Sequence, residues 1–368
     1  MGRFRFDGIL TFSVLGYTIF GFLMFFSAAL GVMARYEAKF FNVINNQFFY
    51  GLCLGLLAFV VGILIPYKVW QKASFVLLPV VAMVCLLVFI PSFGVEINGS
   101  KSWLSVFGFQ FQPSEVLKYV NVLFLASYYH YFYTHKNQTA LHRLLPLGIV
   151  VGATGLIFLQ PDYGTGAIIS AGIVGVFFLL AAKWRDLLAV MLLVIVVGFI
   201  GYTFLPHVSD RINTFLHPDA DTLGTSYQIN QAQIAIGSGK LFGEGYNQSL
   251  QKYHYLPEPI GDSVFAVIGE EFGFLGSLFV ILTILLIGLR LLYLSYNMES
   301  TFERGVLAGT GIIFLAQSFL NIGSISGATP LTGVPLPLVS HGSTSLIITL
   351  GMLGICAQIG GSKLRYKV

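Results

Sequence analysis

The chain has 368 residues, of which 56% are hydrophobic and only 10% are charged, with a formal net charge of +4. Roughly 25% of the residues of a soluble domain are charged, so a chain of this length could not cover its surface with polar groups, and the soluble classes are excluded. The composition therefore predicts a membrane protein that crosses the bilayer many times.

Ten apolar runs are long enough to span a bilayer, which takes about 20 mostly apolar residues. In chain order they cover residues 10–34, 47–65, 73–91, 113–133, 144–160, 164–182, 187–205, 263–295, 305–326 and 338–361. We predict an all-α polytopic membrane protein with about ten transmembrane helices, in a single integral membrane domain over residues 1–368. The eighth run is longer than a bilayer requires, so we expect that helix to tilt or to extend beyond the membrane.

The distribution of Lys and Arg predicts the orientation, because cytoplasmic loops carry an excess of both. With a cytoplasmic N-terminus, most of the Lys and Arg residues fall on the cytoplasmic side, and both termini lie there. This bias explains the net charge and gives no reason to expect a nucleic-acid partner. Cys53, Cys85 and Cys356 lie inside apolar runs, without the spacing of a disulfide framework or a metal site.

Two further segments are unusual. Residues 206–262 form a large extracytoplasmic loop between the seventh and eighth helices, and connections of this length are usually functional or disordered. Short apolar groups alternate there with Gly and Tyr, so we expect this loop to be ordered. Residues 328–345 contain three prolines, which exclude a regular helix and predict a stiff outer loop.

Glu115 and Lys118, in QPSEVLKYV, are ionisable residues within a predicted span. Their spacing of three places both on one face of a helix. Charged residues at membrane depth are rare and face the interior of a bundle or a water-filled cavity. The pair is therefore either a buried ion pair that orients helices or part of a polar, substrate-binding cavity.

Asp162 and Arg211 lie on the outer side of the predicted spans. Asp162, in QPDYGTG, is either a turn or helix-capping carboxylate or a substrate-binding group. Arg211, in SDRINTFLHP, is either a solvated loop charge or a residue that faces an anionic group, since a guanidinium binds phosphate through two parallel hydrogen bonds.

Four carboxylates gather in YLPEPIGDSVFAVIGEE, at the mouth of the eighth predicted span: Glu258, Asp262, Glu270 and Glu271. An Asp-Ser pair before an apolar run is typical of a helix N-cap. The alternative for Asp262 is a general base at the membrane surface, where an amphiphilic substrate presents its head group. The other three acids are either structural or loosely associated with a metal.

Five polar segments resemble, in the same order, motifs of the SEDS family (shape, elongation, division and sporulation), which includes FtsW and RodA. QPSEVLK resembles the family's Q-P-S-E-x-x-K, and QPDYGTG its P-D-x-G-T turn. The other three segments are RINTFLHPDADTLGTSYQINQAQIAIGSGKLFGEG, YLPEPIGDSVFAVIGEEFGFLG and PLTGVPLPLVSHGSTSL. The resemblance covers nearly the whole chain and is closer to FtsW than to RodA.

This resemblance implies a peptidoglycan glycosyltransferase that polymerises lipid II into glycan strands, for cell division or cell shape. The site then lies at the outer face of the bacterial cytoplasmic membrane. Asp262 matches the essential carboxylate of the family's L-P-E-x-x-x-D motif, and Glu115 and Lys118 match its E-x-x-K pair. Arg211, Asp162 and Glu258 are the further candidate substrate-binding residues.

The resemblance also implies the chemistry and the partners. The hydroxyl of one lipid II sugar displaces undecaprenyl pyrophosphate from the anomeric carbon of the growing strand with inversion, which needs one base and no covalent carboxylate. Lys118, Arg211 or a divalent cation such as Mg²⁺ would offset the charge of the leaving group. The expected partners are a class B penicillin-binding protein transpeptidase and membrane proteins of the divisome or elongasome.

Some residues depart from the family motifs. Ile260 and Gly261 stand where His-Thr is common, Ser263 replaces a Phe, and His341 replaces a Tyr. These departures affect the expected positioning of the substrate and leave the carboxylate in place. Two other functions remain as alternatives: a lipid II flippase, for which many spans and an intramembrane ion pair are also suitable, and a scaffold for the partner transpeptidase.

Overall fold

The structure, a computed structural model, describes most of the chain. The described residues are 6–35, 37–97, 99–106, 109–133, 139–183, 185–186, 188, 190, 192, 202–203, 206–217 and 225–362. Within them the chain is mainly helical and contains one small sheet.

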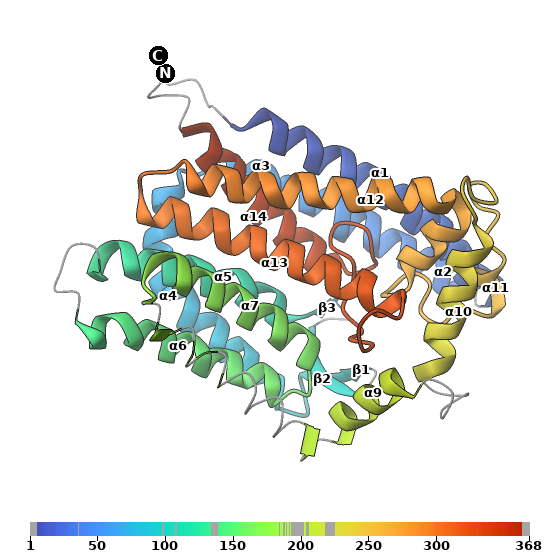
Figure 1. Ribbon diagram of the computed structural model, residues 1–368, viewed down its shortest axis with the longest axis horizontal. Coiled ribbons are helices and arrows are strands. Elements are labelled where there is room, and N and C mark those ends of the chain that lie inside the picture. Colours follow the sequence, from blue (N-terminus) through green and yellow to red (C-terminus); the bar gives the residue numbers. More distant parts are fainter. Residues whose placement is uncertain are drawn as a thin grey trace.

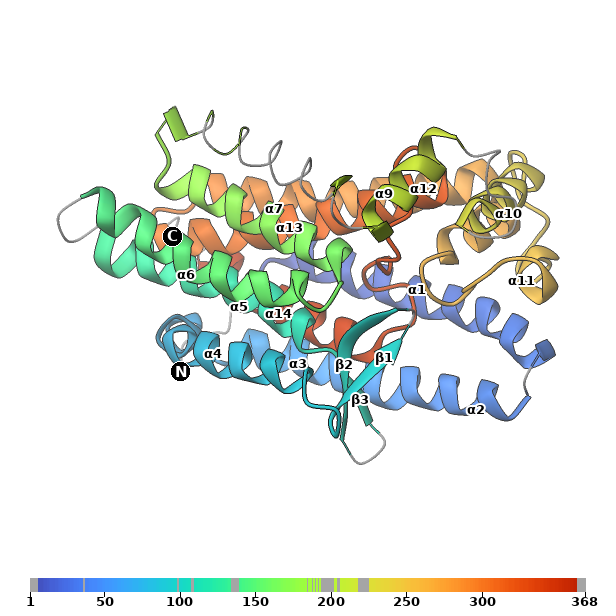
Figure 2. The same cartoon turned by 90° about the horizontal axis from the view of Figure 1, so that it is seen from below.

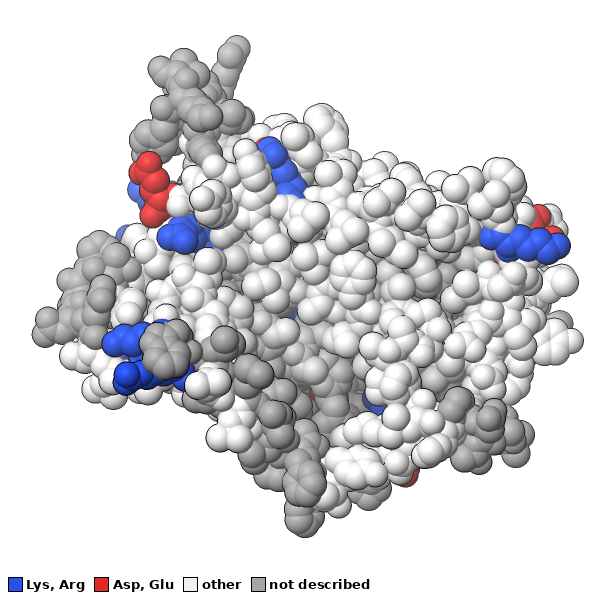
Figure 3. All heavy atoms as spheres, viewed as in Figure 1, with Lys and Arg blue, Asp and Glu red and all other residues white. Residues whose placement is uncertain are grey.

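Long helices packed side by side make up the body of the molecule (Figure 1). Within the described part, eight segments are long and apolar enough to cross a membrane. They are α1 (Gly8–Arg35), the run of α2 (Glu37–Asn45), π-helix η1 (Asn46–Cys53) and α3 (Leu54–Leu64), then α4 (Tyr67–Leu87), α6 (Ala140–Phe158), α7 (Tyr163–Leu180), α12 (Val264–Tyr296), α13 (Thr301–Ile325) and α14 (Ser343–Ser362). Figure 3 shows a broad, largely uncharged surface on the face that carries α12, α13 and α7. The prediction of a polytopic helical membrane protein is confirmed.

A further helix, α5 (Pro113–Tyr128), lies in the centre of the bundle and continues into π-helix η2 (Tyr129–Tyr133). It packs against α4, α7 and α13, and all of its side chains except Val116 are buried. The ion pair of Glu115 and Lys118 explains this position, because charged groups on a lipid-facing surface would be strongly unfavourable.

Each predicted span that the structure describes corresponds to a helix, although α4 ends at Leu87 instead of 91 and α14 begins at Ser343 instead of 338. The seventh, 187–205, lies largely outside the described residues, so the total of ten remains a prediction. Among the described residues of 206–262, which omit 218–224, there are three shorter helices: α9 (Pro206–Leu216), α10 (Thr225–Ser238) and α11 (Gln251–His254). Figures 1 and 2 both place α10 and α11 at one end of the bundle, opposite the turn between α12 and α13.

A three-stranded antiparallel sheet follows α4, and the sequence reading did not predict it. Its strands are β1 (Gly94–Ile97), β2 (Ser100–Val106) and β3 (Phe109–Phe111), in the order β1-β2-β3. Gly94 pairs with Leu104, and Leu104 pairs with Phe111. We call the end of the molecule that carries this sheet, α9–α11 and residues 326–342 the sheet end.

Helix α12 changes direction at Gly273, whose φ of 63° and ψ of −157° are not helical. A side chain here would collide with the Gly243 nitrogen, so glycine is required by both the backbone conformation and the close approach. The first turns of α12 consequently pack against α10 instead of continuing the line of the long helix. This bend accounts for the unusual length of the eighth predicted span.

The start of α1 and the end of α14 lie together, because the Asp7 amide donates to the Ala357 carbonyl at 2.9 Å. The predicted orientation places this end in the cytoplasm and the sheet end outside. In a Cys53→Ala background, Leu250→Cys should therefore react with an impermeant thiol reagent in intact cells, and Ala140→Cys should not. Ser249, the adjacent position, is buried and unsuitable for labelling. Labelling of Ala140→Cys alone would reverse the orientation.

Candidate functional site

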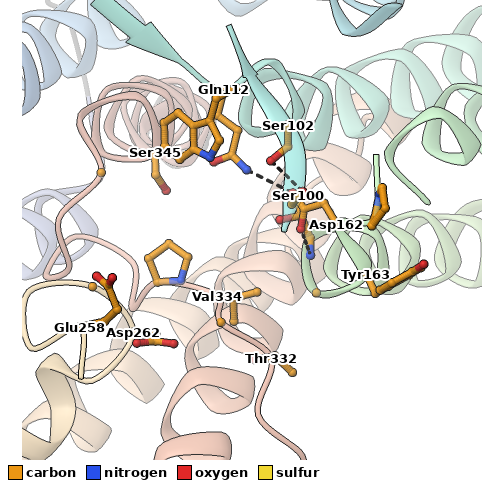
Figure 4. A pocket seen from close by; sticks show the side chains of 18 of the residues that line it. Ser100, Ser102, Gln112, Asp162, Tyr163, Glu258, Asp262, Thr332, Val334 and Ser345 are labelled. Carbon is orange, nitrogen blue, oxygen red and sulfur yellow. Dashed lines mark hydrogen bonds between the residues drawn. The ribbon is translucent and has the colours of Figure 1, made fainter. Parts of the chain in front are cut away.

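A cavity of about 240 Å³ opens among the elements of the sheet end. Figure 4 shows Asp262 and Glu258 on one side of it, and Asp162, Ser100 and Gln112 on the other. The residues that line it come from β2, the start of α7, α9, the turn before α12 and residues 332–345. They are Ser100, Ser102, Trp103, Gln112, Pro161, Asp162, Tyr163, Gly164, Thr165, Arg211, Glu258, Gly261, Asp262, Thr332, Gly333, Val334, Pro335, His341, Gly342 and Ser345.

Asp262 lies one residue before the N-cap of α12. The N-cap is Ser263, and no side chain makes a capping hydrogen bond there. Asp262 Oδ1 instead accepts from Gln228 Nε2 at 3.0 Å, and its main-chain carbonyl accepts from Asn321 Nδ2 at 2.7 Å. The sequence left two interpretations of Asp262 open, a helix cap and a general base. The structure does not place Asp262 in the capping position.

Burial raises the pKa of Asp262 to about 6. The hydrogen bonds from Gln228 and Ser263 oppose this rise, because they favour the charged form, while the negative charge of Glu258 adds to it. At neutral pH the group is thus a carboxylate with a pKa close to the ambient pH, which suits proton transfer.

Glu258 begins the tight turn that presents Asp262. Its carbonyl accepts hydrogen bonds from the amides of Gly261, at 3.0 Å, and Ser263, at 3.3 Å. Its φ of 44° lies in the left-handed region, which is uncommon for a residue other than glycine. The side chain is exposed to the cavity and stands close enough to influence Asp262.

Asp162 has the capping role that was considered for it, and its substrate-binding role stays a prediction. It is the N-cap of α7, where its side chain accepts from the Thr165 amide at 3.2 Å, and it also lines the cavity. Gln112 donates to its second oxygen at 3.1 Å. Burial raises the pKa of this carboxyl above its ordinary value.

Arg211 lines the cavity from α9. One of its guanidinium nitrogens donates to the Thr332 carbonyl at 3.3 Å, which fixes the side chain against the loop after α13. Arg211 is partly buried, and among the lining residues it is the one that carries a guanidinium group. It is therefore positioned to bind an anionic group.

The pair of Glu115 and Lys118 does not line this cavity, in contrast to the substrate-binding role proposed for it. The two charges are 2.8 Å apart and almost completely buried. Lys118 also donates to Gln317 Oε1 at 2.7 Å, and Gln317 Nε2 donates to the carbonyl of Pro335, a lining residue, at 2.9 Å. The pair thus contacts the cavity wall through Gln317.

Residues 326–342 form a non-helical loop, as the prolines predicted, and residues 332–335, 341 and 342 of this loop line the cavity. Two buried amide side chains, those of Gln47 and Asn321, bind the main chain of this loop. Gln47, in π-helix η1, donates to the Ser340 carbonyl at 3.3 Å and accepts from the Gly342 amide at 3.2 Å. Asn321 Nδ2 donates to the Val334 carbonyl at 2.8 Å, so that one side chain links the loop to the Asp262 turn.

Glu270 and Glu271 make structural contacts away from the cavity. Glu271 pairs with Lys252 at 2.7 Å and accepts from the Ser27 hydroxyl at 2.6 Å, both fully buried. Glu270 accepts from the Ser249 hydroxyl at 2.5 Å and from the Leu250 amide at 2.9 Å. The two acids fasten α11 to α12 and α1.

No group of three or more His, Cys, Asp or Glu side chains that could hold a metal occurs among the described residues. The donor set therefore does not fit an ion bound by the protein alone. Mg²⁺ is usually held by one or two carboxylates together with substrate phosphates. A divalent cation accordingly stays a prediction, and no step proposed below depends on it.

Sequence reasoning missed Gln228, Asn321 and Lys252. Asn321 had a usable signal, because it interrupts the apolar run SFLNIG within a span. Gln228 lies inside a motif used for the resemblance but carries no charge, and Lys252 resembles any solvated lysine of a polar loop. Only the packing of α10 and α11 against α12 reveals their partners.

Fold and site together define a polytopic membrane protein with a buried-carboxylate cavity at the head of an apolar helix. The family model of FtsW, RodA and SpoVE, described as "Cell cycle protein", matches residues 8–364. The chain belongs to this family, which confirms the resemblance seen in its motifs.

Individual relatives are similar over nearly the full length. The probable peptidoglycan glycosyltransferase FtsW of Alcanivorax borkumensis is 33% identical, covering 92% of this chain and 89% of its own. Stage V sporulation protein E of Bacillus subtilis is also 33% identical, covering 92% of both chains. A chain of the solved structure "Structural coordination of polymerization and crosslinking by a peptidoglycan synthase complex" aligns with a TM-score of 0.79 and 26% identity over 99% of both chains.

Proposed function

We propose that this protein is a peptidoglycan glycosyltransferase that polymerises lipid II at the outer face of the bacterial cytoplasmic membrane, for cell division or cell shape. The observation that carries the proposal is the Asp262 carboxylate, which stands in a polar cavity at the head of an apolar helix with its pKa raised to about 6. The names of the relatives support the same activity. Both termini then lie in the cytoplasm.

Asp262 acts as the general base in this reaction. Its carboxylate takes the proton from the sugar hydroxyl of lipid II as that oxygen forms a bond to the anomeric carbon of the growing strand. The bond from this carbon to the pyrophosphate oxygen breaks, and the electron pair leaves with undecaprenyl pyrophosphate. A single displacement inverts the anomeric centre and requires no covalent intermediate.

Arg211 would offset the charge of the departing pyrophosphate. Its guanidinium is held at the cavity wall by Thr332, so its orientation is set before the substrate arrives. Lys118 is less suitable for this role than expected, because its side chain is 1% exposed and its ammonium is bound to Glu115 and Gln317. Glu258 and Asp162 would bind sugar hydroxyls from opposite sides.

A lipid II flippase would need a polar path across the bundle. The buried state of the described α5 side chains favours the enzyme over this alternative. A polymerisation assay separates the enzyme from the flippase and from a scaffold: purified protein receives labelled lipid II with and without a class B penicillin-binding protein. Polymer in either arm supports the proposal, and dependence on the added protein would identify it as the required partner. Unpolymerised lipid II in both arms contradicts the proposal.

The polymerisation rate should fall as the pH is lowered through about 6. The pKa of Asp262 is raised to about 6, so the carboxylate that accepts the proton is present above this pH and is lost below it. Initial rates measured between pH 5 and pH 8 test this expectation, with the residual rate of Asp262→Asn as the control. A wild-type rate that stays constant down to pH 5 would contradict it.

A further inference from the structure

Gln228, on α10, holds one oxygen of the Asp262 carboxylate. Its Nε2 donates to Asp262 Oδ1 at 3.0 Å and to the Ser263 hydroxyl at 3.1 Å. The Ser263 hydroxyl is itself 3.4 Å from Oδ1. An amide from one helix and a hydroxyl from the next residue therefore meet at the same oxygen and restrict rotation of the carboxylate.

The second oxygen, Oδ2, lies beside Gly333 in the cavity lining. A Cβ atom placed on Gly333 would lie 4.0 Å from Oδ2, and Gly333 is a lining residue with a φ of 69°. Within the described residues, the hydrogen bonds that other side chains donate to the Asp262 carboxylate go to Oδ1. The two oxygens thus have different surroundings: Oδ1 is bound to the protein, and Oδ2 is left to meet a substrate.

Close packing of α10 on α12 allows Gln228 to reach Asp262. A side chain at Gly239, just after α10, would collide with the Gly269 carbonyl of α12, so the two backbones are in direct contact. The main chain of Asp262 is held separately by Asn321, whose Nδ2 also binds the Val334 carbonyl. Loss of the Gln228 amide would therefore release the carboxylate while the turn that carries it stays fixed.

We propose that Gln228 is a positioning residue, which anchors Oδ1 of Asp262 and thereby directs Oδ2 toward the hydroxyl group that attacks. This inference rests on the proposed glycosyltransferase function. The titratable and charged side chains that share the cavity with Asp262 are Asp162, Tyr163, Arg211, Glu258 and His341. A substitution at Gln228 leaves all of them unchanged, so a change in the titration of Asp262 is attributable to the lost amide.

Gln228→Leu removes the donor and keeps a side chain of similar size. We expect kcat to fall about 10- to 100-fold with little change in KM, because the base is misdirected. The acidic limb of the pH–rate profile should move up by about one unit, since a lost hydrogen bond to the charged form disfavours that form. Gln233→Leu is the matched control: it lies on the same helix, and its Nε2 donates to the Ser326 carbonyl at 3.1 Å. It should leave kcat and the limb at wild-type values.

A readout that is independent of activity accompanies the kinetics. Infrared titration of the carboxyl group, as the difference between wild type and Asp262→Asn, should show a midpoint near pH 6 for wild type. The difference between Gln228→Leu and the double variant Gln228→Leu, Asp262→Asn should show a higher midpoint. Gln228→Glu, which keeps the side-chain length, should raise the midpoint as well, because it adds a negative charge, and it serves if the leucine variant is poorly folded.

The outcomes separate this inference from the proposed function. An active wild type whose kcat, acidic limb and infrared midpoint are unaltered by Gln228→Leu overturns the positioning role alone. If Gln228→Leu raises the infrared midpoint but the wild-type protein makes no polymer, the result supports the anchoring of Asp262 by Gln228 and overturns the glycosyltransferase function. Equal losses in Gln228→Leu and Gln233→Leu, without a change of midpoint, would reduce Gln228 to a structural contact of α10.

Discussion

Asp262→Asn should abolish lipid II polymerisation while the protein keeps wild-type expression and melting temperature. The asparagine oxygen can still accept the hydrogen bonds of Gln228 and Ser263, and the main-chain bond to Asn321 is unaffected. An amide cannot accept a proton at neutral pH, however. Loss of a general base typically lowers the rate by about 10²–10⁴-fold.

The measurement is polymer length and initial rate with labelled lipid II, beside a thermal melt of each variant. Asp262→Ala should lose activity equally, and because Ser263 is the N-cap, it should cost no capping energy. Asp186→Asn is a matched carboxylate control, since Asp186 accepts from the Lys183 amide and from Arg143, remote from the cavity. Long glycan strands from the asparagine variant would rule out Asp262 as the base and favour the flippase or the scaffold.

Glu115→Gln should destabilise the protein and lower polymerisation. It leaves the buried ammonium of Lys118 without its carboxylate, and breaking one side of a buried ion pair costs about 3–5 kcal/mol. Lys118 also holds Gln317, which in turn binds the Pro335 carbonyl in the cavity wall. A weakened pair should therefore reduce activity through the position of this wall, without any direct contact with the substrate.

The double variant Glu115→Gln, Lys118→Met distinguishes these two effects. Without a buried charge the melting temperature should recover, whereas polymerisation should stay low because Gln317 has lost its ammonium partner. Full activity in the double variant would show that the pair serves stability alone. Asp186→Asn combined with Arg143→Met removes another ion pair, 2.7 Å long and remote from the cavity, and should leave polymerisation unchanged.

The candidate site was partly predictable, because its ionisable residues are conspicuous in a chain with so few charges. Asp262 stands at the mouth of an apolar run, and Glu115 and Lys118 interrupt another. Their partners were not predictable in the same way. Lys118 binds Gln317, a residue 199 positions later in the chain, and helical spacing along α5 says nothing about which side chain of α13 lies opposite.

The membrane class, most of the helical segments and the presence of a carboxylate at the mouth of the eighth span follow from local properties of the chain. The length of the apolar runs sets the spans, and the prolines exclude a helix over most of 328–345, since α14 begins only at Ser343. Ionisable groups near lipid are rare and therefore conspicuous in the sequence. Tertiary packing decided the rest. It removed Glu115 and Lys118 from the cavity, and it brought Gln228 to one oxygen of Asp262. These contacts depend on how close two helices approach, as at Gly239 against Gly269, and that distance is a property of packed surfaces that no single segment of sequence contains.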